Sequence, residues 1–247
     1  MILSLCMNIG ADPTHQGVLE PAFTGSKSFA QIYTLTALCD DATYLQVQFT
    51  LTNLGISDKN AGCRILLIRK GRAPLAWSDT YSRRKWSYAD DSAQTLSMGA
   101  SRISIGSGST SIAAVGNTVR VDVAFGCEPV RTVPPDAYIA AGNRFFEHGI
   151  LIPWAAVHVC LARPGEAMAK LTGFAMLEVS RSTSFPADIC RGWVTFRGYR
   201  ETTHFSTAVR LPPGDATPAT GWAWWYENQD SPRFLACPWR HGVGGFQ

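Results

Sequence analysis

Apolar and polar residues alternate with a period of two along much of the chain. The segment 44–52, YLQVQFTLT, keeps this alternation throughout, and 118–125, TVRVDVAF, repeats it. A period of two is that of a β-strand with one buried face. No twelve-residue window keeps apolar residues at helical spacing without Gly, Pro or alternation. The pattern therefore predicts an all-β protein.

The predicted strands are numerous and short. They lie near 31–38, 44–52, 63–70, 76–82, 85–89, 95–98, 102–105, 111–115, 118–125, 148–163, 167–180, 193–200, 203–211 and 221–227. Two hairpins are expected, one turning at Asp40-Asp41 and one at Pro164-Gly165. Many short strands separated by turns are typical of a barrel or a sandwich. We expect one such domain over 28–230, preceded by an arm, 1–27, and followed by a tail, 231–247.

Composition narrows the class of partner. Charged residues make up 17% of the chain, below the roughly 25% of an average domain, and aromatic residues are plentiful. The net charge of +3 is too small and too mixed for nucleic-acid binding. No apolar run approaches the ~20 residues of a membrane-spanning helix. Seven cysteines without CxxC spacing favour free thiols in a reducing, cytoplasmic compartment.

Three segments together resemble a known superfamily: VQFTLTNLGISDKNAG (47–62), HGILIPWAAVHVCL (148–161) and GFAMLEVSRSTSFPADICRGWVTFRG (173–198). The chain is similar, over roughly residues 30–228, to carotenoid hydratases (hydroxyneurosporene synthases), AttH-like proteins and the yeast survival-factor proteins. Several pericyclases share that architecture. The resemblance implies a lipocalin-like antiparallel β-barrel with an apolar cavity for a small molecule.

The chain departs from the family pattern in two ways. Family members usually carry two lipocalin-like domains in tandem, whereas this chain has the length of the first, so a homodimer or a partner domain is expected. The strand that contains GFAMLEVSRST commonly carries an Asp-His pair in the family. Here those positions are Glu178 and Val179, so the carboxylate is kept and the imidazole is not.

Glu178 is the first catalytic candidate. Alternation puts it on the same face as Met176. If that face is the barrel interior, burial should raise the pKa of the carboxyl group, which suits a general acid near neutral pH. The alternative is an ion pair with Arg181 or Arg197 that ties strands together.

The substrate-binding candidates are mostly aromatic: Trp154, Trp193, Arg197, Tyr199, Trp222 and Trp224. Rings on the inner wall of a barrel can hold an apolar or polyene ligand and stabilise a developing cation. They can equally be ordinary core. Arg197 lies near Arg181, Asp188 and Arg191 in the sequence, which predicts either a salt-bridged network or a site for a ligand carboxylate.

The histidines leave two alternatives open. His158 is the second catalytic candidate, as a proton shuttle, or else a hydrogen-bonded structural residue. The histidines at 148, 158 and 204 lack zinc-site spacing, so no metal is expected. IGSGST lacks the lysine of a phosphate-binding loop, and no motif indicates a nucleotide or redox cofactor.

Resemblance and aromatic content together predict an enzyme. It would bind a polyketide, terpenoid or polyene in a barrel cavity and catalyse a cofactor-independent cyclisation, isomerisation or hydration. Two alternatives stay open: a non-catalytic carrier of hydrophobic ligands, and a half-protein that pairs with a second lipocalin-like domain.

Overall fold

A computed structural model describes residues 17–55, 57–134, 137–142, 144–200, 203–211, 220–227 and 233–238. The described residues form strands β1 to β16 in two antiparallel sheets, a 3₁₀ turn (Arg83–Lys85) and one short helix, α1 (Pro186–Ile189). The all-β prediction is confirmed. The helix is a single turn, in keeping with a sequence that lacks helical periodicity.

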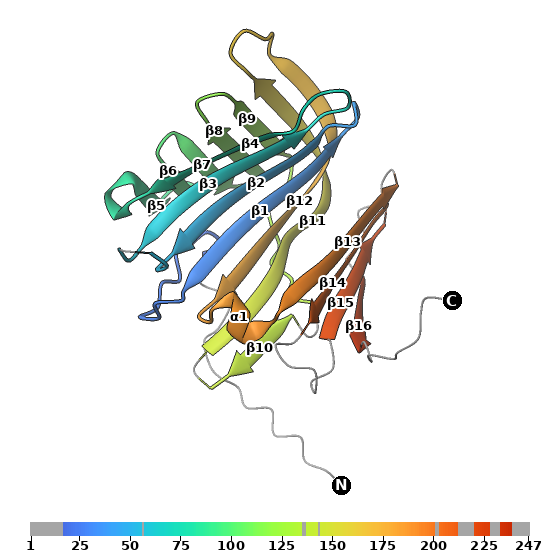
Figure 1. Cartoon of the computed structure of the whole chain (residues 1–247). Helices are drawn as coiled ribbons and strands as arrows, with labels where there is room; N and C mark the ends of the chain where they lie inside the picture. Colours follow the sequence, from blue (N-terminus) through green and yellow to red (C-terminus); the bar gives the residue numbers. More distant parts are fainter. Residues whose placement is uncertain are drawn as a thin grey trace.

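The larger sheet curls into a nearly closed barrel (Figure 1). Its strands, in spatial order, are β4 (Leu75–Tyr81), β3 (Asn60–Ile68), β2 (Tyr44–Thr52), β1 (Ala30–Cys39), β12 (Ala169–Ser182), β11 (Arg144–Ala162), β9 (Arg120–Phe125), β8 (Ser109–Val115), β7 (Ser101–Gly106), β6 (Gln94–Met98) and β5 (Trp86–Asp90). Strand β10 (Tyr138–Ala141) pairs with the start of β11, off this path. Both predicted hairpins are present.

The smaller sheet has four strands: β13 (Gly192–Arg200), β14 (Thr203–Leu211), β15 (Thr220–Tyr226) and β16 (Arg233–Pro238). It stands beside the barrel wall formed by β11 and β12 (Figure 1). Alternation predicts its first three strands. Strand β16 lies in the segment 231–247, where the sequence shows no strand pattern.

The barrel interior is filled by side chains. The largest residues with almost no exposed surface include Tyr33, Phe49, Leu96, Met98 and Ile103. Each comes from the inward positions of an alternating strand. Dispersion contacts and burial of apolar surface on this scale account for the stability of the barrel.

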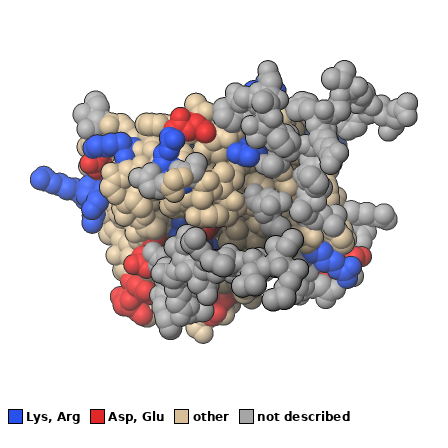
Figure 2. Space-filling model, turned by 90° about the horizontal axis from the view of Figure 1, so that it is seen from below, with Lys and Arg blue, Asp and Glu red and all other residues tan. Residues whose placement is uncertain are grey.

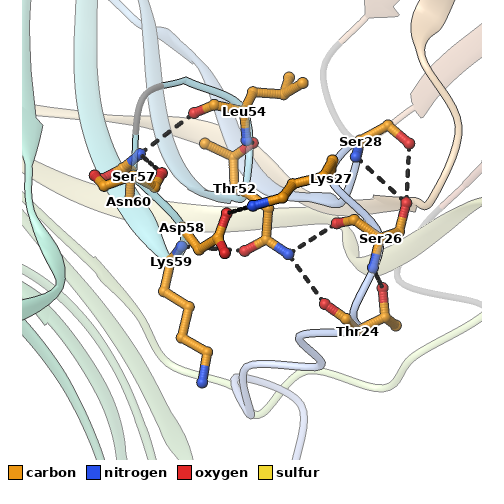
Figure 3. A network of polar contacts seen from close by, with 11 residues as sticks. Thr24, Ser26, Lys27, Ser28, Thr52, Leu54, Ser57, Asp58, Lys59 and Asn60 are labelled. Atoms are coloured by element: carbon orange, nitrogen blue, oxygen red, sulfur yellow. Dashed lines mark hydrogen bonds and ion pairs between the residues drawn. The ribbon is translucent and has the colours of Figure 1, made fainter.

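One end of the barrel is tied by a polar network (Figure 3). Asn53 donates to the carbonyl oxygens of Thr24 and Ser26 at 3.0 and 2.8 Å and accepts from the amide of Lys59 at 3.1 Å. The Lys27 ammonium pairs with Asp58 at 2.7 Å. The network joins the segment before β1 to the loop between β2 and β3.

The middle of β11 and the second half of β12 are buried on both faces. On β12, Leu177 and Val179 face the barrel core, whereas Met176 belongs to a second core between β11, β12 and the smaller sheet. Alternation puts Glu178 on the same face as Met176, toward the smaller sheet. The face that the sequence analysis assigns to the barrel interior is therefore the outer face of the barrel wall, covered by a second sheet.

Candidate active site

The second core brings together most of the predicted site residues. Its members and the residues packed against it include Trp154, Trp193, Tyr199, Trp222 and Trp224. The sequence analysis places these rings on the inner wall of the barrel. The structure places them outside the barrel wall, because β13, β14 and β15 form a separate sheet that turns its ring-bearing face toward β11 and β12.

Glu178 lies at the centre of a charged cluster within this aromatic layer. Its Oε2 lies 2.7 Å from a guanidinium nitrogen of Arg197 on β13, and its Oε1 lies 3.2 Å from Nε2 of His148 on β11. The side chains of Glu178, His148 and Arg197 are 6%, 14% and 22% exposed, respectively. The cluster therefore has little water to screen it, and its charges interact strongly.

The pKa of Glu178 shifts in the direction opposite to the sequence prediction. Burial alone would raise it, but the hydrogen bond and charge interaction with His148 and the positive charge of Arg197 together lower the pKa of the carboxyl group below its usual value. The expected rise in the pKa is therefore not found, and the catalytic role of Glu178 stays a prediction. Glu178 is a carboxylate at neutral pH, suited to accept a proton or to orient an imidazole.

His148 places an imidazole beside Glu178. In the register of β11 and β12, Ile150 pairs with Glu178 and His148 pairs with Ser180, so the ring reaches Glu178 diagonally. Because Glu178 is ionised, Nε2 carries a hydrogen and donates to it. Nδ1 lies 3.0 Å from the Ser180 hydroxyl. The sequence analysis did not assign His148 to catalysis, because nothing in a linear sequence shows which residue of β11 faces Glu178.

Aromatic rings surround the cluster on the side of β13 and β15. The His148 ring lies 5.4 Å from that of Trp222, Trp222 lies 5.6 Å from Trp193, and Trp193 lies 5.1 Å from Phe146. Such faces favour apolar ligands and stabilise positive charge near them. A carboxylate, an imidazole and a guanidinium thus meet inside an otherwise ring-lined layer.

His204 is enclosed beside this cluster. Its ring stacks on Trp154 at 4.5 Å and on Tyr199 at 5.5 Å, and meets the edge of Trp224 at 4.7 Å. The residue is 0% exposed. Burial lowers its pKa to about 4 despite the nearby Glu178 charge. The backbone of Pro153 lies close enough to favour the charged ring, but among the described residues neither ring nitrogen finds a partner with hydrogen-bond geometry.

His158 lies elsewhere. It is exposed, and its register partner on β12 is Thr172, six residues before Glu178. Six residues of extended strand span about 20 Å. The structure therefore does not bring the two predicted catalytic residues together. His158 lines a groove instead.

The groove has a volume of about 940 Å³ and runs between β9, β11 and the end of the smaller sheet. Trp154 and Phe174 line it from the barrel wall, and Tyr226 and Phe234 line it from β15 and β16. Since Trp154 also stacks on His204, this indole separates the groove from the Glu178 cluster.

The charged residues near Trp193 in the sequence do not form one network, because each interacts with a different group. Arg197 pairs with Glu178, and Asp188 pairs with Arg144 at 2.7 Å. Arg181 faces the barrel core, where its charge acts on Tyr33. Of the two ion pairs considered for Glu178, the one with Arg197 is present.

The described residues contain no group of three or more His, Cys, Asp or Glu placed to share a metal ion. In the same part of the chain, no helix is long and apolar enough to cross a membrane. Figure 2 views one end of the molecule, where basic and acidic side chains lie scattered at the periphery.

Comparison with known proteins identifies the fold. An AttH-like protein from Nitrosomonas europaea matches with a TM-score of 0.60 and 12% identity, over 85% of this chain and 68% of that one. Kievitone hydratase from Nectria haematococca matches with a TM-score of 0.53 and 14% identity, over 84% and 64%. CghA with Sch210972 matches with a TM-score of 0.57 and 8% identity, over 82% and 59%. No protein-family model and no curated protein sequence matches the chain.

These structures confirm the predicted lipocalin-like β-barrel and the resemblance to AttH-like and hydratase proteins at the level of the fold. The chain spans 59% to 68% of the length of the three structures.

Proposed function

We propose that this protein is a cofactor-independent enzyme that hydrates or cyclises a hydrophobic small molecule of the polyketide, terpenoid or polyene class. The reaction would take place in the layer between the barrel and the smaller sheet. The observation that carries the proposal is the cluster in which a nearly buried Glu178 carboxylate meets His148 and Arg197 among aromatic rings. Groups of this kind are costly to bury, and such costs are common at functional sites.

The cluster can move one proton in each direction. In a hydration, a protonated His148 ring would donate its proton to one carbon of a double bond, and water would add to the other carbon. The added water would then lose a proton to His148, either directly or by way of Glu178, which restores the starting state. The rings of Trp193 and Trp222 would stabilise the carbocation between these steps. Arg197 keeps Glu178 ionised and can polarise a carbonyl group of the substrate.

In a cyclisation, the same layer would act mainly by shape. Two ring-lined sheet faces hold a flexible chain in one folded conformer, which removes much of the entropic barrier. The polar cluster would then polarise one carbonyl or move one proton. The name of one structural neighbour, a hydratase, favours testing hydration first.

The test is turnover of a panel of neutral prenylated, polyketide and polyene compounds that includes kievitone, followed by mass spectrometry. We expect Glu178→Gln and His148→Gln each to lower turnover at least ~100-fold. Glu166→Gln, at an exposed carboxylate outside the cluster and the groove, is the matched control and should keep full turnover. If a substrate is found and neither Glu178→Gln nor Trp193→Ala changes its turnover, the site assignment is wrong.

A non-catalytic carrier is the second candidate, and the mutual satisfaction of Glu178 and Arg197 favours it. Native mass spectrometry after mild purification would support a carrier if a lipid stays bound and no variant of the cluster alters its retention.

Pairing with a second copy or a partner domain stays a prediction, supported by Val194 and Phe196, which are more than half exposed on β13. Gel filtration that shows a monomer at all concentrations would count against it. A cytoplasmic location also stays a prediction.

A further inference from the structure

The groove beyond Trp154 has the form of a ligand site in its own right. Its volume of about 940 Å³ falls at the upper end of the range for drug-sized ligands. It has an aromatic wall on each side, Trp154 and Phe174 on one and Tyr226 and Phe234 on the other. A flat or extended apolar molecule between these walls would bury most of its surface.

Small residues keep the groove open. Ala124 and Gly126 at the end of β9 and Ala156 on β11 line it, and all three are exposed. A Cβ atom added at Gly126 would meet nothing within 4 Å. Large side chains at these outward strand positions would fill the space, so the groove exists because the residues there have small side chains.

The charged groups of the groove have one sign. Asp40 and Glu128 contribute carboxylates, His158 contributes an imidazole, and the described lining residues include no Lys or Arg. Asp40 is fixed by a hydrogen bond from the Thr172 hydroxyl, and Glu128 accepts a hydrogen bond from the Gly108 amide. Two fixed carboxylates beside an apolar wall repel an anionic ligand and tolerate a neutral or cationic one.

We propose that this groove binds the apolar body of an extended ligand that carries no negative charge, such as a neutral terpenoid, polyene alcohol or phenol, and that it discriminates against carboxylates such as fatty acids. The inference depends on the proposed function in one respect: the molecule bound in the groove is taken to be the substrate of the enzyme. The ligand lies along β11 with one end at Trp154, on the far side of which His204 and the Glu178 cluster lie.

The experiment uses retinol and retinoic acid as probes, because they share one polyene and differ in a neutral hydroxyl against a carboxylate. Binding to the full chain is followed at pH 7.5 by quenching of tryptophan fluorescence. We expect retinol to bind at least ~10-fold more tightly than retinoic acid, a difference of about 1.4 kcal/mol. The double variant Asp40→Asn/Glu128→Gln should narrow this ratio by strengthening retinoic acid binding.

A steric variant locates the site. Ala156→Trp should weaken retinol binding at least ~10-fold, whereas Ala76→Trp, at an exposed alanine on β4 outside the groove, should leave binding unchanged. Thermal unfolding checks that both variants are folded. Undiminished retinol binding by folded Ala156→Trp, or equal affinity for the two probes, overturns the proposal.

Failure of the groove and failure of the proposed function can be told apart. The probe experiment measures binding alone and does not involve Glu178 or His148. Loss of probe discrimination with intact, Glu178-dependent turnover would reject the groove and keep the enzyme. Confirmed groove binding with turnover indifferent to Glu178→Gln would reject the catalytic cluster and keep the ligand site.

Discussion

The barrel interior and the layer between the two sheets are built on the same pair of strands and differ in almost everything else. From β12, Leu177 and Val179 enter the barrel core, and Met176 and Glu178 enter the layer. The barrel core consists mostly of hydrocarbon and aromatic side chains, and the buried polar residues Gln31 and Arg181 lie beside Tyr33 within it. The layer is bounded by two sheet faces, and it contains a carboxylate, two imidazoles and a guanidinium among its rings.

The two faces of this wall contribute differently: the inner face packs into the barrel core, and the outer face holds the charged cluster. A barrel with a large apolar core can supply most of the free energy of folding, while the charged Glu178 cluster lies on the other face of β11 and β12. Charged groups in the layer cost stability, and the barrel can offset that cost. A fold arranged in this way can vary its chemistry by changes to the outer face while its core stays intact.

The largest effect on stability should come from the barrel core. Phe49→Ala removes a fully buried ring from the filled interior, and we expect the free energy of unfolding to fall by about 3–5 kcal/mol. Urea denaturation measures it. Ile68→Ala, at an exposed position of neighbouring β3, is the control and should cost less than ~1 kcal/mol. A loss below ~1 kcal/mol for Phe49→Ala would mean that the barrel is loosely packed.

The second effect distinguishes the layer by its response to acid. The folded His204 has a pKa of about 4, whereas an unfolded histidine titrates near 6.5. Between these values the unfolded chain binds a proton that the folded chain does not, so stability falls as pH is lowered from about 6.5 toward 4. The slope is at most about 1.4 kcal/mol per pH unit for one group. Urea midpoints at half-unit pH steps measure it.

Two variants assign this slope. His204→Phe keeps a ring in the stack and should abolish most of the dependence above pH 5, where carboxyl groups contribute little. His158→Phe, at an exposed histidine, should leave the slope as in the wild type. An unchanged slope in His204→Phe would show that His204 is not the titrating group.

The third effect compares the two sheets directly through a matched pair of glycines. A Cβ atom at Gly173 on β12 would lie 2.3 Å from the Leu38 carbonyl oxygen, and one at Gly221 on β15 would lie 2.5 Å from the Ala208 carbonyl oxygen. Each alanine forces a backbone shift that we expect to cost about 1–3 kcal/mol. Hydrogen exchange should show increased opening in the barrel for Gly173→Ala and in the smaller sheet for Gly221→Ala.

The control for both is Gly126→Ala, where a Cβ atom meets nothing within 4 Å. It should leave exchange unchanged in either sheet. Increased exchange of barrel amides in Gly221→Ala would show that the two sheets unfold as one unit, and the distinction between the regions would then be structural only.

The sequence was sufficient to predict most strands of the barrel, since alternation such as that of Leu45 to Leu51 follows from the geometry of a half-buried strand. It did not predict which sheet a strand joins. The alternation of β15 is the same whether Trp222 and Trp224 face a barrel interior or the outside of another wall. Strand β16 has no alternation to detect, and its pairing with β15 is a property of the folded chain.

The candidate site was predicted only in part for the same reason. Resemblance identified Glu178, and burial was expected correctly. The direction of its pKa shift was not, because it depends on partners from β11 and β13 that a linear sequence does not place next to it. His148 lies thirty residues before Glu178 and becomes its neighbour only through the register of β11 with β12.

The smallest effect is expected for an exposed ion pair on the surface of the barrel. It serves as the control for the nearly buried ion pair in the layer. Lys27 and Asp58 pair at 2.7 Å with side chains 77% and 53% exposed, and Arg197 pairs with the nearly buried Glu178 at the same distance. Lys27→Met should change the free energy of unfolding by less than ~0.5 kcal/mol, because water and salt screen the pair. Arg197→Met should cost about 1–3 kcal/mol, since it leaves the Glu178 carboxylate with one fewer partner. Urea denaturation at low and high salt measures both, and an equal cost for the two variants would show that water reaches the layer as freely as it reaches the surface.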